Sequence, residues 1–240
     1  MRMLTVNRGE ESLRRLGLRV AAKSFDGLLV IEPEGALGAI AEVDGAGLPV
    51  VLMDDRFQRP GFPYVATTNL ESGGQAVRHL LDLGRRRPLM VTGPDEYGCT
   101  RERLRGFVDV CARAGIEPDQ HSIIGGDFLF DSSRGAVAQA RADGVEFDAV
   151  FGRNDPSADG VLTALHEAGL TIPRDVAVAG FDDVVHLSGT DDRPPADAGD
   201  GEVAASLLLD HVRDRPRPPP SRTIPTSLVI RGSTSQPGPN

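Results

Sequence analysis

A set of polar residues follows short apolar runs in this sequence. Carboxylates, a carboxamide and guanidinium groups can bond the paired hydroxyls of a sugar or nucleoside, and an aromatic ring can cover its apolar face. A single carboxylate after a strand often caps the next helix, so only the combination indicates a site. The same carboxylates could also act as acid and base in glycoside cleavage, which requires one pair across the scissile bond. The residues are Asp54, Asp55, Arg101, Arg103, Asp127, Phe128, Arg153, Asn154, Asp155, Asp182 and Asp183.

Other site chemistries find little support in the sequence. The five histidines are scattered, with no HExxH pair and no His and Cys cluster. Cys99 and Cys111 match neither a CxxC pair nor a zinc knuckle. There is no GxxxxGK[ST], no GxGxxG and no GxSxG motif. We therefore expect no metal, no cofactor and no catalytic residue.

Composition limits the classes of partner. The 240 residues carry a formal net charge of −9, which disfavours binding of a polyanion by this segment alone. The apolar runs at 27–31 and 49–53 are far shorter than the roughly 20 residues that a membrane span needs. Charged residues follow Val6 closely, so the N-terminus lacks the apolar segment of a secretory signal. These features predict a cytoplasmic protein with no membrane partner.

The hydrophobic pattern predicts an α/β fold. Short apolar runs alternate with helical patterns, and the continuous apolar strands suit parallel sheets covered on both faces. Two sheets are favoured because about nine strands are many for one core. The predicted strands are 3–6, 27–31, 49–53, 64–66, 88–92, 121–124, 148–151, 176–180 and 223–230; the predicted helices are 9–22, 36–46, 70–83, 100–114, 132–142, 157–168 and 201–213.

Local signals mark the ends of some helices. In the predicted helix 100–114, Thr100 is the expected N-cap and Gly115 the glycine just beyond the C-terminus. Cys111 lies on the apolar stripe of this helix, which predicts a small buried side chain and not a reactive thiol. Asp155 precedes Pro156, so we expect it to cap the following helix.

Many motifs, in order, resemble a known family. From residue 24 to 234 the order of "FDGLLV", "GLPVVLMDD", "TTNLESGGQAVRHLLDLG", "TRERLRGF", "GGDF", "FDAVFGRND" and "DVAVAGFDD" resembles the effector-binding core of lac-repressor and galactose-repressor type (LacI family) transcription regulators. The resemblance implies a type I periplasmic-binding-protein-like fold with two doubly wound lobes. A sugar or purine would lie between the lobes, and the chain would cross between them several times.

The resemblance also implies which residues bind the effector. They are Asp54 at the end of a strand of the first lobe, Arg103 of the "RLxG" motif, the aromatic Phe128 after "GD", Asn154 of the "ND" pair and Asp182 of "FDD". Helical periodicity alone does not favour Arg103 over Arg101. The resemblance makes that choice.

Two departures from the family concern the N-terminus. No helix-turn-helix precedes the core, and "MRMLTV" is similar to the family's second strand, so its first strand and helix are missing. In a 2-1-3-4-5 sheet that first strand lies between the second and the third. We therefore expect an N-terminally truncated core with an incomplete first lobe. The expected domains are 1–67 with about 196–219, 68–195 with 220–234, and a disordered tail at 235–240.

The sequence therefore predicts the ligand-sensing core of a LacI-type regulator, acting by ligand-dependent lobe closure and not as an enzyme. DNA would be contacted only through a helix-turn-helix absent from this chain, and a homodimer is expected if the first lobe is complete. Two alternatives stay open. One is a stand-alone or transport-type sugar-binding protein; the other is a carbohydrate-active hydrolase that uses Asp54 or Asp182.

Overall fold

In the structure, which is a computed structural model, the chain divides into two units. Unit 1 comprises Met1–Thr68, Glu96–Gly98 and Pro195–Thr226, and unit 2 comprises Asn69–Asp95, Cys99–Pro194 and Ser227–Asn240. The chain therefore passes from one unit to the other several times. The residues that the structure describes are 3–7, 25–31, 37–53, 62–95, 97–183, 200–214 and 220–235.

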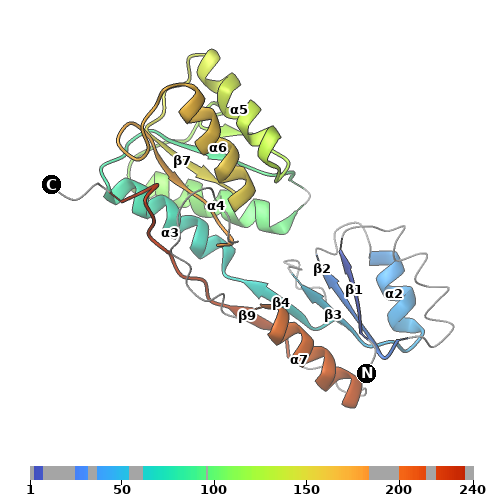
Figure 1. Cartoon of the computed structure of the whole chain (residues 1–240). Coiled ribbons are helices and arrows are strands. Elements are labelled where there is room, and N and C mark those ends of the chain that lie inside the picture. Colours follow the sequence, from blue (N-terminus) through green and yellow to red (C-terminus); the bar gives the residue numbers. More distant parts are fainter. Residues whose placement is uncertain are drawn as a thin grey trace. The chain divides into compact units, whose positions relative to one another are not determined.

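Unit 1 is built on a five-stranded parallel sheet (Figure 1). Its strand order, β1-β2-β3-β4-β9, follows the order of the chain. The strands are β1 (Met3–Asn7), β2 (Gly27–Ile31), β3 (Val50–Met53), β4 (Tyr64–Thr67) and β9 (Arg222–Ile224).

Each face of this sheet is covered by one described helix. Leu28 and Val30 lie in a cluster with residues of α2 (Leu37–Gly45), whereas Leu29 lies in a cluster with residues of α7 (Asp200–Arg213). Successive residues of a strand point to opposite faces. An unbroken apolar run such as 27–31 therefore suits a strand that is buried on both sides.

The edge strand β1 pairs directly with β2. The register is parallel, with Met3 opposite Gly27 and Asn7 opposite Ile31. The family's 2-1-3-4-5 order would put another strand between these two. In this chain the two strands are neighbours, and backbone bonding between them is continuous.

Strand β9 is the edge strand on the other side of the same sheet. It pairs in parallel with β4, with Val65 opposite Arg222, and the N–H of Tyr64 donates to Ser221 Oγ at 3.1 Å. The sequence prediction had a strand over 223–230 in the second lobe. The structure instead has a strand only at Arg222–Ile224, and its pairing with β4 puts that segment in unit 1.

Unit 2 is built on a four-stranded parallel sheet with the order β6-β5-β7-β8. Its strands are β6 (Ile123–Ile124), β5 (Pro88–Val91), β7 (Ala149–Gly152) and β8 (Ala177–Ala179). The chain goes from β5 to β6 on one side and then returns to β7 on the other. The winding therefore reverses between β5 and β7, which is the topological switch point of the sheet.

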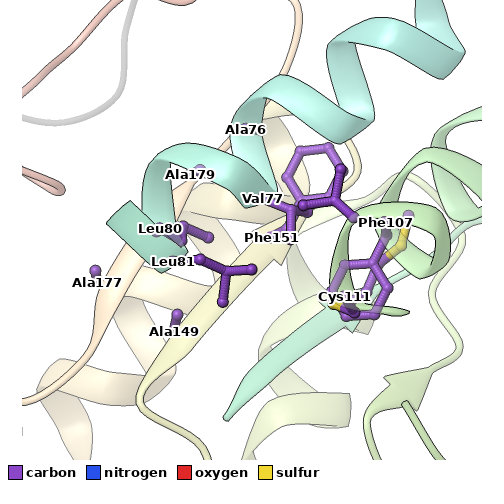
Figure 2. Packing of buried hydrophobic residues seen from close by; sticks show 12 residues of the cluster. Ala76, Val77, Leu80, Leu81, Phe107, Cys111, Ala149, Phe151, Ala177 and Ala179 are labelled. Carbon is purple, nitrogen blue, oxygen red and sulfur yellow. The ribbon is translucent and has the colours of Figure 1, made fainter. Parts of the chain in front are cut away.

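Two pairs of helices cover the two faces of this sheet. α3 (Asn69–Asp82) and α4 (Gly98–Arg113) pack on one face, where Phe107 and Phe151 are fully buried (Figure 2). α5 (Phe130–Ala142) and α6 (Asp155–Glu167) pack on the other face. These layers confirm the predicted α/β fold with parallel sheets.

The helices α3 and α4 approach each other closely at a glycine. A Cβ added at Gly106 would clash with the carbonyl oxygen of Leu70 and lie 2.8 Å from the N of Gly74. Only a residue without a side chain fits between these two backbones. The glycine of the "RLRGF" motif is therefore a packing residue.

The end signals of α4 were partly right. Gly115 has a φ of +73° just beyond the helix, and the N–H of Ile116 donates to the Cys111 carbonyl at 2.9 Å, which closes the C-terminus. Thr100 was the wrong N-cap, because the helix begins two residues earlier at Gly98. Cys111 is fully buried as predicted, and burial raises the pKa of its thiol to about 11.

The arginines at 85–87 hold loops of unit 2 together. Arg85 donates to the carbonyl oxygens of Pro173 and Arg174, and the N–H groups of Arg86 and Arg87 donate to the Asp148 carboxylate. These contacts support a structural role for the three arginines.

Some predictions lie outside the described residues. They include the helix at 9–22, the side chains of Asp54 and Asp55, and the tail beyond residue 235. Among the helices that the structure does describe, none is long and apolar enough to span a bilayer.

Candidate functional site

Four of the five predicted ligand residues come together in unit 2. Arg103 is on α4, Phe128 follows β6, Asn154 follows β7 and Asp182 follows β8. The last three stand after the carboxyl ends of parallel strands, around the switch point between β5 and β7. Ligands bind at such points in open α/β sheets. The fifth residue, Asp54, falls in a part of the chain that the structure leaves undescribed.

Arg103 is the centre of this cluster. It is 5% exposed, and its Nε donates to Asn69 Oδ1 at 2.7 Å while Nη1 donates to the carbonyl oxygen of Arg153 at 2.8 Å. Its Nη2 lies 3.6 Å from Asp182 Oδ1, and its Cζ lies 3.3 Å from the centre of the Phe181 ring. One guanidinium thus ties α3, the end of β7 and the end of β8 together.

Arg101, the competing arginine, is used differently. It is exposed and donates to the carbonyl oxygen of Asp95. The structure therefore brings Arg103, and not Arg101, to the carboxylate of Asp182.

Phe128 and Arg153 form a second cation–π pair. The Cζ of Arg153 lies 3.3 Å from the centre of the Phe128 ring, and the two residues are only 3% and 6% exposed. Arg153 also donates to the sulfur of Cys99. A Cβ at Gly93, which follows β5, would lie 2.6 Å from the Phe128 ring, so this glycine makes room for the aromatic side chain.

Asn154 uses both ends of its carboxamide. Its Oδ1 accepts a hydrogen bond from the N–H of Ser157 at 3.0 Å and so caps α6, and its Nδ2 donates to the carbonyl oxygen of Phe128 at 3.2 Å. The sequence prediction that Asp155 is the cap was wrong. The cap lies one position earlier, at Asn154, and Asp155 is the first residue of the helix. Its side chain is buried.

Two residues of the cluster have strained backbones. Phe128 has a φ of +74° and Asp182 a φ of +101°, in the region that favours glycine. Such residues cost roughly 1–3 kcal/mol each and gather at binding and catalytic sites. Backbone strain is therefore one more feature that this cluster shares with such sites.

The other candidate carboxylates at this edge have local partners. Asp127 accepts from the N–H of Leu129 at 3.0 Å, which forms a turn before α5. Asp183 pairs with the guanidinium of Arg231. These contacts support structural roles for both residues.

The sequence prediction missed three members of the cluster as site residues. Asn69 orients Arg103, Phe181 stacks on it, and Arg153 stacks on Phe128. Arg153 stood among the polar residues after a strand, and Phe181 directly precedes Asp182. Asn69 carried no such signal, because its role depends on the contact of α3 with α4 in three dimensions.

The geometry suits a polar uncharged ligand with several hydroxyls. Carboxylate and carboxamide groups lie beside guanidinium and aromatic groups, and together they can donate, accept and stack. No group of three or more metal-binding side chains occurs in the described part of the chain.

The comparisons with known proteins agree with this fold. The family model of the periplasmic binding protein-like domain matches residues 77–234. The HTH-type transcriptional regulator CelR of Thermobifida fusca is 30% identical over 243 residues, which cover 96% of this chain and 70% of that protein. This chain belongs to the LacI family of transcriptional regulators. Within that family it corresponds to the effector-binding core.

Two further LacI-family matches support the assignment. The HTH-type transcriptional repressor CytR of Escherichia coli (strain K12) is 30% identical over 220 residues. The match covers 90% of this chain and 64% of CytR, so the chain spans about two thirds of that relative's length. A solved CelR complex with cellobiose has a TM-score of 0.82 and 29% identity, and the match covers 94% of this chain and 71% of the other.

Proposed function

We propose that this LacI-family core senses a saccharide or nucleoside effector through the cluster at the switch point of unit 2. Arg103, Asn154 and Asp182 would bond the hydroxyls of the effector, and Asp54, which lies outside the described residues, stays a predicted ligand residue. The observation that carries the proposal is the position of the Arg103 guanidinium of α4. It lies 3.6 Å from the carboxylate of Asp182 after β8 and donates to the carbonyl oxygen of Arg153, the neighbour of Asn154 after β7. The cellobiose bound to CelR, a relative that is 30% identical, supports a saccharide as the ligand class.

The proposed output of binding is a change in conformation. A ligand shifts an equilibrium between two states only by its different affinity for them, and coupling of roughly 1–3 kcal/mol is typical. In the complete regulator, lobe closure would alter the geometry of a helix-turn-helix in a homodimer on DNA. We infer a cytoplasmic regulator that binds its effector without converting it.

Isothermal titration calorimetry tests the proposal. Cellobiose, galactose, ribose and adenosine would be titrated into the wild-type chain, and we expect saturable binding of at least one of them. Arg103→Ala should weaken that binding by about 10- to 100-fold, because charge-assisted bonds are lost. Arg101→Ala is the matched control on the same helix and should bind as the wild type does.

Two results would contradict the proposal. Equal affinities of the Arg103→Ala and wild-type chains would remove Arg103 from the site. Cleavage of cellobiose during the titration, lost in Asp182→Asn, would favour the hydrolase alternative.

A further inference from the structure

We propose that Asn69 is a positioning residue, which holds the guanidinium of Arg103 for the effector and ties it to the point where the chain enters unit 2. The inference rests on the proposed function, in which Arg103 binds the effector. Asn69 itself makes no contact with the ligand in this proposal. Two features of α3 lead to it: its contacts with α4 and the place of Asn69 in the chain.

Asn69 is almost completely enclosed, and Arg103 uses its amide oxygen. The residue is 1% exposed, and its Oδ1 accepts a hydrogen bond from Arg103 Nε at 2.7 Å. Nη1 of the same guanidinium donates to the carbonyl oxygen of Arg153 at 2.8 Å. Because a guanidinium is planar, acceptors on two of its nitrogens fix the direction of the third. Asn69 therefore helps to set the position of Nη2, which lies 3.6 Å from Asp182 Oδ1.

The backbone of α3 meets Arg103 as well. A Cβ added at Gly73 would lie 2.6 Å from the carbonyl oxygen of Arg103 and 2.9 Å from its Cα. Gly73 comes four residues after Asn69, about one helical turn, so the two residues share one face of α3. That face fixes the backbone of Arg103 at Gly73 and its side chain at Asn69.

Asn69 also directly follows a point where the chain leaves unit 1. The chain crosses between the units at residues 68–69 and again at 226–227. The hydroxyl oxygens of Thr68 and Thr226 lie 3.1 Å apart, and the N–H of Thr226 donates to Thr68 Oγ1 at 3.1 Å. The bonds that join the two crossings therefore end one residue before the side chain that holds Arg103.

This arrangement links effector binding to the two crossings. An effector that immobilises the guanidinium of Arg103 also restrains Asn69, which is one peptide bond away from Thr68. Coupling between two sites is reciprocal, so restrained crossings would in turn favour the position of Arg103 that binds the effector.

A double-mutant cycle tests whether Asn69 acts through Arg103. Calorimetry would measure the affinity of the full chain for whichever of cellobiose, galactose, ribose and adenosine binds the wild type, and ligand-observed NMR would cover weak binding. Asn69→Ala should weaken binding about tenfold in the wild-type background and less than about twofold in Arg103→Ala. The matched control Gln75→Ala removes an exposed carboxamide from the same helix and should bind as the wild type does.

A conservative variant separates positioning from a merely structural role. Asn69→Asp keeps an acceptor oxygen for Nε and puts a carboxylate at a helix N-terminus, so it should bind within about threefold of the wild type. Circular dichroism establishes that each variant is folded. If the alanine chain does not fold, Asn69→Ser replaces it in the cycle, because its shorter side chain keeps a hydroxyl but does not reach Nε.

Hydrogen exchange tests the link to the crossings. The amide of Thr226 donates to Thr68 Oγ1, so its exchange rate reports whether that bond is kept. Saturation with the compound that binds should slow this exchange in the wild type and in Gln75→Ala. It should leave the rate unchanged in Asn69→Ala saturated with the same compound.

Each failure has its own signature. Equal losses of affinity from Asn69→Ala in the wild-type and Arg103→Ala backgrounds would overturn the positioning role and leave the proposed function intact. Exchange at Thr226 that is unchanged in the wild type, or slowed equally in Asn69→Ala, would overturn the link to the crossings. If none of the four compounds binds the wild type, the proposed function fails and the role of Asn69 fails with it.

Discussion

The carboxamide oxygen of Asn154 accepts a hydrogen bond from the N–H of Ser157 at 3.0 Å, and the carboxamide nitrogen donates to the Phe128 carbonyl oxygen. One side chain therefore links the start of α6 to the loop after β6. The bond to Ser157 caps the helix, and the bond to Phe128 holds the loop. Different substitutions of Asn154 can test the two bonds separately.

Asn154→Ala should lower the free energy of unfolding by about 1–2 kcal/mol, because the helix cap is lost. Asn154→Ser keeps a capping oxygen and should retain most of that stability, but its shorter side chain lacks the amide N–H group that donates to the Phe128 carbonyl. We expect Asn154→Ser to weaken effector binding measurably while urea unfolding stays close to wild type. Equal unfolding midpoints for the alanine and serine variants would contradict the capping role.

Gly106→Ala should destabilise unit 2 by on the order of 2–3 kcal/mol, since the added methyl group meets the backbone of α3. Gly135→Ala on α5 is the matched control, because its Cβ would have no heavy atom within 4 Å. That control should gain roughly 0.5–1 kcal/mol from helix propensity. Chemical unfolding of both variants, monitored by circular dichroism, tests the opposite signs.

Cys111 should react very slowly with Ellman's reagent in the folded chain. With the thiol pKa raised by burial to about 11, about one thiol in a thousand is ionised at pH 8. The experiment uses Cys99→Ser, so that Cys111 is the only cysteine. Rapid labelling without denaturant would show that the thiol is accessible and would refute the predicted burial.

Asp175 should make stability depend on pH in the acidic range. Hydrogen bonds from the Arg174 guanidinium and the Thr171 N–H lower the pKa of Asp175 from 3.8 to about 2. The folded state thus favours the charged form, and this stabilisation is present above about pH 4 and is lost as the pH falls through 2. Urea unfolding should show Asp175→Asn less stable than wild type at pH 6, with the difference shrinking between pH 4 and pH 2. A difference that stays constant with pH would rule out this linkage.

The sequence predicted the sheets better than it predicted the ends of the helices. The predicted strand at 27–31 is β2 with the same bounds. An apolar run of five residues between polar ones is too short for a buried helix and so favours a strand. Two adjacent residues at the start of α6, Asn154 and Asp155, are of types that often cap helices, and the sequence prediction placed the cap on the wrong one. Which of the two stays outside the helix depends on the path of the chain after β7.

The candidate site was predicted through family resemblance more than through periodicity. The resemblance selected Arg103, Phe128, Asn154 and Asp182, and the structure brings all four into one cluster. Their effector contacts remain predictions. The supporting contacts of Asn69 and Arg153 could not be read from spacing, because they arise where elements distant in sequence meet.

The bond between Tyr64 and Ser221 joins residues 157 positions apart. During synthesis on the ribosome, the first four strands of unit 1 emerge long before β9 does, and nearly all of unit 2 is made in between. The β4 edge of the nascent sheet therefore stays unpaired until β9 has been made. Exposed sheet edges invite wrong pairing with other chains, so this interval is when the protein most needs protection from aggregation.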